Sequence, residues 1–150
     1  MKLTAAERAI VNQAKKILRE NLTPYGEQFI CPDTTKNYLT LKLAHLEREE
    51  FHVLMLSKNH ELIEDWRAST GTIDSAAVYP REIIKKALSV NAAAMILAHN
   101  HPSGNAEPSS ADRAITKVIV EAAQLLDLRV LDHVIIGQLN SVSFAERGLI

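Results

Sequence analysis

The chain has 150 residues, of which 47% are hydrophobic, and its formal net charge is -1 at neutral pH. This length suffices for one compact core and is short for two ordinary domains, so we expect a single domain. The balanced charge gives no overall basic field that would indicate nucleic acid or an anionic membrane as a partner. The one cysteine, Cys31, excludes an intrachain disulfide and a cysteine-rich zinc site, so any metal must use His and carboxylate ligands.

The N-terminal residues carry charges throughout and contain no apolar block of the kind that a signal peptide needs. The longest apolar stretch, Ala92–Ala98, is much shorter than the ~20 residues of a membrane-spanning helix. We therefore expect a soluble protein of the reducing cytoplasm, without a membrane partner.

The first part of the chain predicts two helices. From Thr4 to Glu20 apolar residues recur at helical spacing, and Thr4 with Glu7 has the spacing of a capping box. Residues 21–35 contain prolines and a glycine, which are typical of a connection. Apolar positions from Tyr38 to Leu46 then predict a second helix. We expect both helices to cover one side of the core.

Strands and helices alternate in the remainder. Segments 51–56 and 61–66 predict a β-hairpin, and Pro80 opens a predicted helix that runs to Leu88. Ala92–Ala98 predicts a fully buried strand. A helix is predicted over 111–126 and strands over 129–136 and 142–144. This order predicts an α/β domain with a mixed sheet and helices on both faces.

Two histidines follow the buried strand. Residues i and i+2 of a strand project to the same side, so His99 and His101 can direct both imidazoles at one point. Catalytic zinc sites use three His or carboxylate ligands and leave a fourth position for water. Because turn residues between His101 and Asp112 can fold the loop back, we expect Asp112 to be the third ligand.

Ser109 and Asp112 have capping-box spacing, so a simple helix cap is an alternative interpretation that is compatible with a metal site. Ser110 could take the cap instead. A capping serine beside a metal would also place a hydroxyl where an oxyanion develops during carbonyl hydrolysis. Ser109 is therefore a candidate catalytic residue.

Metal hydrolysis needs a carboxylate that takes a proton from water at the metal. Glu49 and Glu50 precede the first hairpin strand, and alternation puts Glu49 on the side of Phe51 and Glu50 on the side of His52. We favour Glu49 as the base, with Glu50 as the alternative. The register of the strand decides between them.

The pattern of His99-x-His101 followed by Ser109-x-x-Asp112, preceded by a glutamate before an apolar strand, resembles the JAMM (MPN-plus) metalloprotease motif of deubiquitinating enzymes. Within that superfamily the chain is most similar to bacterial RadC-like proteins, a family with an old label of DNA repair. The similarity extends from about Tyr38 to the C-terminus. It rests on Gly71–Asp74, Val78–Glu82, Ala98–Gly104, Pro108-Ser109, Val130–His133 and Ser143–Gly148.

The resemblance implies a three-layer α/β/α fold of the cytidine-deaminase-like (JAB/MPN) type, with a helical extension over about 1–36. It also implies Zn²⁺ on His99, His101 and Asp112, Glu49 as general base, and Ser109 stabilising the tetrahedral intermediate. We therefore expect a zinc-dependent hydrolase of peptide or isopeptide bonds with a peptide or protein substrate. Exposed edge strands would allow a homodimer as well as a monomer.

RadC-like proteins often carry a helix-hairpin-helix DNA-binding region ahead of this domain, and the residues before Tyr38 are too few for one. This departure argues against DNA binding. The alternative hypotheses are a DNA-associated accessory protein without hydrolase activity, which the family label suggests, and a metal-bound scaffold without turnover. His133, beside Asp132, is expected to be a hydrogen-bonded structural residue or a residue that supports a metal ligand, and not a fourth metal ligand. His45, His52 and His60 lack partners at metal spacing, and one cysteine cannot build a nucleotide-deaminase zinc site.

Overall fold

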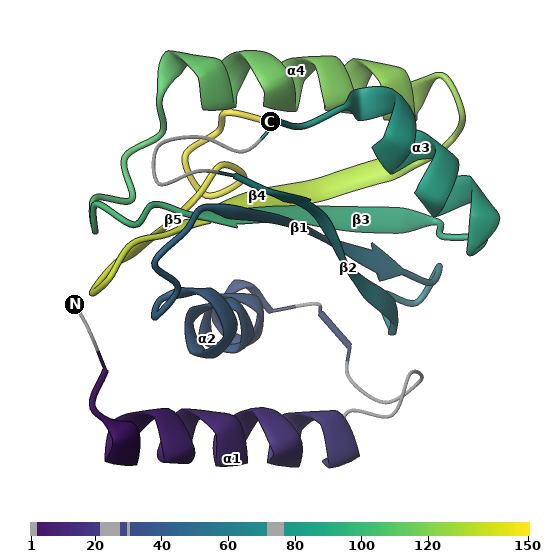
Figure 1. Cartoon of the computed structure of the whole chain (residues 1–150). Coiled ribbons are helices and arrows are strands. Elements are labelled where there is room, and N and C mark those ends of the chain that lie inside the picture. Colours follow the sequence, from purple (N-terminus) through teal and green to yellow (C-terminus); the bar gives the residue numbers. More distant parts are fainter. Residues whose placement is uncertain (1–2, 22–27, 30, 72–76) are drawn as a thin grey trace.

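A five-stranded sheet forms the centre of the molecule, with helices on both of its faces (Figure 1). The computed structural model describes residues 3–21, 28–29, 31–71 and 77–150. The sheet order is β2-β1-β3-β4-β5, in which β3 and β4 are parallel and the other neighbours are antiparallel. The predicted three-layer arrangement with a mixed sheet is thus confirmed. The strands are β1 (Glu50–Leu56), β2 (Leu62–Thr70), β3 (Ala94–Asn100), β4 (Arg129–Ile136) and β5 (Ser141–Ser143).

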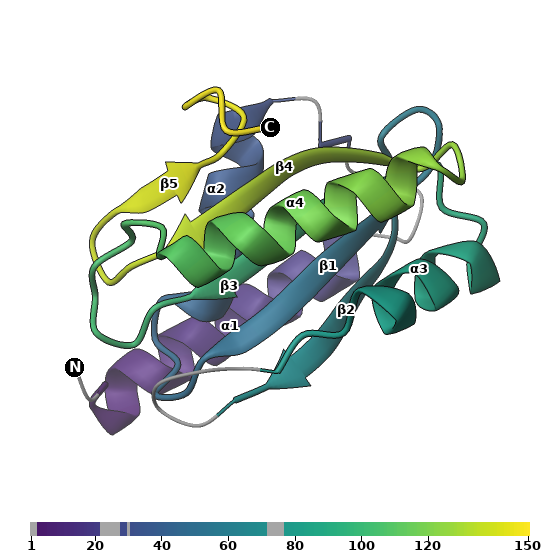
Figure 2. The same ribbon diagram turned by 90° about the horizontal axis from the view of Figure 1, so that it is seen from above.

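Each face of the sheet buries its own set of apolar side chains. Helix α2 (Pro32–Leu43) covers one face, and helices α3 (Pro80–Ser89) and α4 (Ser110–Gln124) cover the other (Figures 1 and 2). On β3, Ile96 packs in the α2 core and Leu97 in the α3/α4 core, as strand alternation requires. His99 has the same parity as Leu97, so it continues the α3/α4 side.

Helix α1 (Ala5–Asn21) lies against α2, on the side of α2 away from the sheet (Figure 1). The predicted capping box is present, because Thr4 N donates to Glu7 Oε2 at 2.7 Å and Glu7 N donates to Thr4 Oγ1 at 3.3 Å. The outer position of α1 leaves Ile10 67% exposed. Helix α2 is therefore the helix that covers this face, and the prediction that both helices do so is wrong for α1.

Helix α2 begins at Pro32, earlier than the predicted start at Tyr38. Proline is compatible with the first turn of a helix, where its missing N–H leaves no intrahelical bond unmade. The prediction took this proline as part of a connection. The helix buries Thr35, Leu39 and Leu43, which are spaced by four residues and so share one side.

The hairpin of β1 and β2 is confirmed, although β2 runs on to Thr70. Strand β1 also pairs with β3, with Phe51 opposite His99 and Leu56 opposite Ala94. The start of β1 therefore lies beside the end of β3. This pairing places the segment that contains Glu49 and Glu50 next to the end of β3 that carries the histidines.

No helix among the described residues is both long and apolar enough to cross a lipid bilayer. Of the motif Gly71–Asp74, residues 72–74 lie outside the described residues, as do parts of the connection predicted over 21–35.

Candidate metal centre

Two histidine side chains converge where β3 leaves the sheet. His99 is the second-last residue of β3, where it pairs with β1, and His101 follows the strand directly. Their Nε2 atoms lie 2.9 Å apart. His99 is 1% exposed, and 17% of the His101 side chain is exposed. One imidazole is thus enclosed by the core and the other borders solvent.

Asp112, in the first turn of α4, completes the cluster. Its Oδ1 lies 3.2 Å from His99 Nε2, and its Oδ2 lies 3.5 Å from His101 Nε2. One potential ligand atom from each of His99, His101 and Asp112 lies within 4.8 Å of the others. The structure therefore brings together the three residues that the sequence predicted as ligands, and they form a group that could hold a metal ion.

The loop between His101 and α4 folds back toward the histidines because it is anchored at several points. His101 N donates to Ile136 O at 2.9 Å, and the side chain of Ala106 is fully buried beside Ile135. Gly137 approaches the loop so closely that a Cβ would lie 2.4 Å from the carbonyl oxygen of Gly104. A side chain at position 137 would push the loop away, so glycine is needed there.

Ser109 is the N-cap of α4, and Ser110 is the first helical residue. The Ser109 backbone N–H and hydroxyl both donate to Asp112 Oδ2 at 2.7 Å, and Asp112 N donates back to Ser109 Oγ at 3.1 Å. The capping box therefore orients the Asp112 carboxylate. Because Ser109 occupies Oδ2, Oδ1 is the oxygen turned to His99.

The hydrogen bonds of the imidazoles fit a bound cation. His101 Nδ1 lies 2.7 Å from the carbonyl oxygen of Asn105, which can only accept, so Nδ1 carries the proton and Nε2 of the neutral ring keeps its lone pair. His99 Nδ1 is also occupied, at 2.8 Å from His133 Nε2. Both Nε2 atoms are thus left to face Asp112. Two imidazole nitrogens and one carboxylate are a donor set that zinc prefers.

Charge within the cluster shifts the acid–base behaviour of its members. The hydrogen bond with Asp112 raises the pKa of His101 above its usual value, against the opposing effect of burial. Burial acts to raise the pKa of Asp112, but the contacts with His101 and His99 outweigh it and hold that pKa well below its usual range. Asp112 is therefore ionised at neutral pH, as a metal ligand must be.

The two candidate bases have opposite parity at the start of β1. The carboxylate of Glu50 lies 3.0 Å from His52 Nε2 and 3.3 Å from Arg67 Nη1, and is turned away from the histidine cluster. Glu49 precedes β1 with the parity of Phe51, whose ring stacks on His99 at 5.8 Å between centroids. The charge of Glu49 also raises the pKa of His101. The register thus brings Glu49, and not Glu50, toward the cluster.

The family model of the RadC-like JAB domain matches residues 29–149. The chain belongs to this family. A UPF0758 protein of Vibrio cholerae is 52% identical over 144 residues, which cover 96% of this chain and 90% of that protein. UPF0758 proteins of Vibrio parahaemolyticus and Aliivibrio fischeri are 50% and 51% identical over 142 residues, and the chain spans 63% of the length of each. The resemblance to RadC-like proteins is thus confirmed.

Asn100 holds the Glu49 segment of this RadC-like JAB domain in place. Its side chain is buried on the α2 side of β3, opposite to His99. Asn100 Oδ1 accepts from Glu50 N at 2.8 Å, and Nδ2 donates to Arg48 O at 3.0 Å. Gly71 N donates to Glu49 O at 2.8 Å. The residue between the two histidines therefore positions the backbone on both sides of Glu49, a role that the sequence did not indicate.

His133 and Thr116 are two further buried neighbours of the cluster. His133 lies on β4 beside His99, and Thr116 lies one turn after Asp112 on α4. The sequence signalled His133 as a polar residue in an apolar strand, in line with the expected hydrogen-bonded role. Thr116 had no signal, because a threonine within a helix is ordinary.

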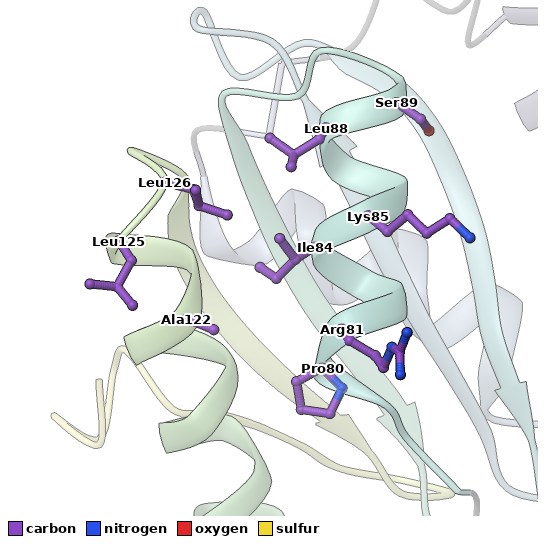
Figure 3. A pocket seen from close by; sticks show the side chains of 9 residues that line it. All are labelled: Pro80, Arg81, Ile84, Lys85, Leu88, Ser89, Ala122, Leu125 and Leu126. Carbon is purple, nitrogen blue, oxygen red and sulfur yellow. The ribbon is translucent and has the colours of Figure 1, made fainter.

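An apolar groove of about 870 Å³ lies between α3 and the end of α4 (Figure 3). Ile84 and Leu88 line it from α3, and Ala122, Leu125 and Leu126 from α4 and the turn that follows. Leu125 is 86% exposed. Since α4 rises about 1.5 Å per residue, its C-terminal end lies far from Asp112 in the first turn. The groove therefore contributes no residue to the candidate metal centre.

Proposed function

We propose that this RadC-like JAB domain is a zinc-dependent hydrolase of peptide or isopeptide bonds. The observation that carries the proposal is the convergence of two imidazole nitrogens and one ionised carboxylate within 4.8 Å, beside Glu49. When bound, zinc supplies a Lewis acid that lowers the pKa of a coordinated water and polarises a carbonyl group.

His99 and His101 would hold the ion through Nε2, since the Nδ1 atom of each is engaged in another hydrogen bond. Asp112 would hold it through Oδ1, because Oδ2 accepts two hydrogen bonds from Ser109. Three protein ligands would match the number found in catalytic zinc sites, which keep a further position for water or substrate. The partial exposure of His101 and Asp112 supports access from solvent.

Glu49 is the proposed general base. It would accept the proton of the attacking water and donate it to the leaving amine, so that one carboxylate serves both halves of the reaction. The two side-chain hydrogen bonds of Asn100, to Glu50 N and Arg48 O, are called the Asn100 clamp. This clamp and the hydrogen bond from Gly71 N hold the Glu49 backbone at the edge of the cluster. A fixed backbone reduces the entropy that the Glu49 side chain must lose when it engages the water.

Ser109 is proposed to donate its hydroxyl hydrogen to the carbonyl oxygen as negative charge develops there. In the structure this hydrogen is directed at Asp112 Oδ2. The role therefore requires the hydroxyl to rotate toward the substrate, while the Ser109 backbone N–H continues to orient Asp112.

The direct test combines zinc content with amide hydrolysis. Because the candidate site has three ligands, we expect about one zinc per chain in protein that is purified without chelator. Elemental analysis measures this zinc content. We expect His101→Ala to bind no zinc and to cleave neither peptides nor isopeptides in substrate libraries. Mass spectrometry of the products measures the cleavage. His60→Asn is the matched control, because His60 lies in the turn between β1 and β2 with φ 62°, a conformation that asparagine tolerates.

Zinc in the wild type and in His60→Asn, with neither zinc nor cleavage in His101→Ala, would support the proposal. A wild type that takes up no zinc when it is supplied would refute it. Zinc binding without cleavage of any amide would refute the hydrolase and leave a metal-bound scaffold.

A further inference from the structure

Three buried polar side chains form a chain of hydrogen bonds behind the candidate metal centre. His99 Nδ1 lies 2.8 Å from His133 Nε2, and His133 Nδ1 lies 2.6 Å from Thr116 Oγ1. Thr116 Oγ1 donates to the backbone carbonyl oxygen of Asp112 at 2.6 Å. His133 is completely buried, and His99 and Thr116 are nearly so. The chain thus starts at one candidate ligand and ends at the backbone of another.

The last acceptor sets the direction of every proton in this chain. A carbonyl oxygen can only accept, so the single hydroxyl hydrogen of Thr116 is used on Asp112. Thr116 Oγ1 must then accept from His133 Nδ1, which therefore carries a proton. The reverse direction would leave two oxygen atoms 2.6 Å apart with no hydrogen between them.

His133 is neutral in this arrangement. Its two ring nitrogens contact His99 and Thr116, and the adjacent Asp132 carboxylate accepts from the backbone N–H of His133 and from Ser143 instead. A buried imidazolium without a carboxylate partner is costly. With its proton on Nδ1, neutral His133 presents a lone pair at Nε2. His99 must donate from Nδ1 to that lone pair, so the lone pair of His99 lies on Nε2.

The ring of His133 is held in this orientation by its neighbours. Phe144 lies 4.7 Å and Phe51 lies 5.5 Å from it between ring centroids. Phe144 is itself fixed, because its backbone N–H donates to the carbonyl oxygen of His133 at 2.9 Å. The imidazole therefore has little freedom to turn and reverse its hydrogen bonds.

We propose that His133 and Thr116 are positioning residues that keep the proton of His99 on Nδ1 and so direct its Nε2 lone pair at the metal. The proposal rests on the metal site of the proposed function. Outer hydrogen bonds of this kind orient a ligand and fix its tautomer. The outer partner is usually a carboxylate, a carbonyl or water, whereas here it is a neutral imidazole. It orients His99 without adding a second negative charge beside Asp112.

The test measures zinc affinity by competition with a chelator and, in metal-free protein at a pH where the imidazoles are neutral, the tautomer of His99 by ¹⁵N NMR. We expect Thr116→Val and His133→Phe to lower zinc affinity roughly 10- to 100-fold, as loss of outer partners typically does. Thr116→Ser retains the hydroxyl and should bind zinc with the affinity of the wild type. The NMR spectrum should show the Nδ1–H form of His99 in the wild type and a mixture in Thr116→Val and His133→Phe.

Thr35→Val is the matched control. Thr35 is a buried threonine of α2 whose hydroxyl also donates to the carbonyl oxygen four residues earlier, that of Cys31, at 3.4 Å. It lies on the opposite side of the sheet, so its loss should leave zinc affinity unchanged. Any general effect of losing a buried hydroxyl would appear in this variant.

Folded Thr116→Val with wild-type zinc affinity, or an Nε2–H form of His99 in the wild type, would overturn the proposal. A wild type that binds no zinc but shows the Nδ1–H form would instead overturn the metal site and uphold the hydrogen-bond chain. The two failures are thus distinguishable, because the NMR readout does not depend on the metal.

Discussion

At the residue scale, the chemistry depends on which side of its strand each side chain lies. His99 and His101 point to the α3/α4 side, whereas Asn100 between them points to the α2 side. Glu49 and Glu50 divide in the same way across β1. A shift of one residue in the register of β1 would exchange the two glutamates, and the same shift in β3 would turn its histidine toward the other core.

Replacing the two glutamates separately tests this division. We expect Glu49→Gln to lower the rate of amide hydrolysis by about 10²- to 10⁴-fold, because a positioned general base is lost, while zinc content stays unchanged. Glu50→Gln should keep most of the activity, since its carboxylate binds His52 and Arg67. Rates from peptide cleavage and zinc by elemental analysis check both variants. Equal loss of activity in the two would contradict the assignment.

Zinc binding should depend on pH through His101. Its pKa is raised by Asp112, so a proton occupies His101 at pH values where an isolated histidine is already neutral. Zinc must displace that proton, and zinc affinity should therefore fall as the pH decreases through the raised pKa. Competition titrations between about pH 5 and 8 measure this, together with proton release on binding. An affinity that does not change over this range would contradict the prediction.

At the element scale, the site depends on how three element ends are joined. The end of β3, the start of β1 and the first turn of α4 meet at the cluster, and each is held by hydrogen bonds to a neighbour. Asn100 joins β3 to the segment before β1, and the Ser109 capping box orients the carboxylate of α4. The return of the loop depends on the close contact between Gly104 and Gly137.

Asn100→Leu tests the clamp. The variant leaves Glu50 N–H and Arg48 C=O without their partner, and we expect a loss of about 1–3 kcal/mol in the free energy of unfolding. Because the Glu49 backbone loses its position, hydrolysis should fall much more than zinc affinity. Urea unfolding, zinc titration and peptide cleavage measure the three effects. Exposed Asn59→Leu is the control, and full activity of folded Asn100→Leu would exclude the clamp.

At the scale of the whole molecule, α2 is attached to the sheet by a charged network as well as by apolar packing. Asp65 of β2 accepts from Tyr38 OH at 2.6 Å and lies 2.9 Å from His52 Nδ1. Lys42 also donates to Asp65. Burial acts to raise the pKa of Asp65, but His52 and Lys42 outweigh it, and the pKa is lowered to about 2.

Acid should therefore weaken the attachment of α2. A folded-state pKa below the unfolded value means that Asp65 contributes stability above pH 3.8, which is lost as the pH falls toward about 2. The difference in pKa corresponds to about 2 kcal/mol in the free energy of unfolding. Asp65→Asn should thus destabilise the protein at neutral pH and approach the wild type near pH 2, in denaturant titrations.

The control for this prediction is Asp127→Asn. Asp127 is exposed in the turn after α4 at φ 56°, where asparagine is tolerated. It removes one carboxylate without touching the network, so its stability should follow that of the wild type at every pH. A difference between wild type and Asp65→Asn that does not shrink in acid would contradict the linkage.

Features set by near neighbours in the chain could be predicted from the sequence by itself. These features depend on residues that are close together in the sequence: the capping boxes at Thr4 and Ser109, the Pro80 helix, the hairpin of two consecutive strands, and the paired histidines. The alternating order of helices and strands was enough for the fold class. The start of α2 was missed because a proline is compatible with both a connection and a first helical turn.

Features that join distant segments were decided only by the tertiary structure. The separation of Glu49 from Glu50 depends on the pairing of β1 with β3, and the Asn100 clamp joins residues about fifty positions apart. The hydrogen bonds of His133 and Thr116 join β3, β4 and α4. Such contacts follow from strand register and packing across the core, for which local spacing carries no signal.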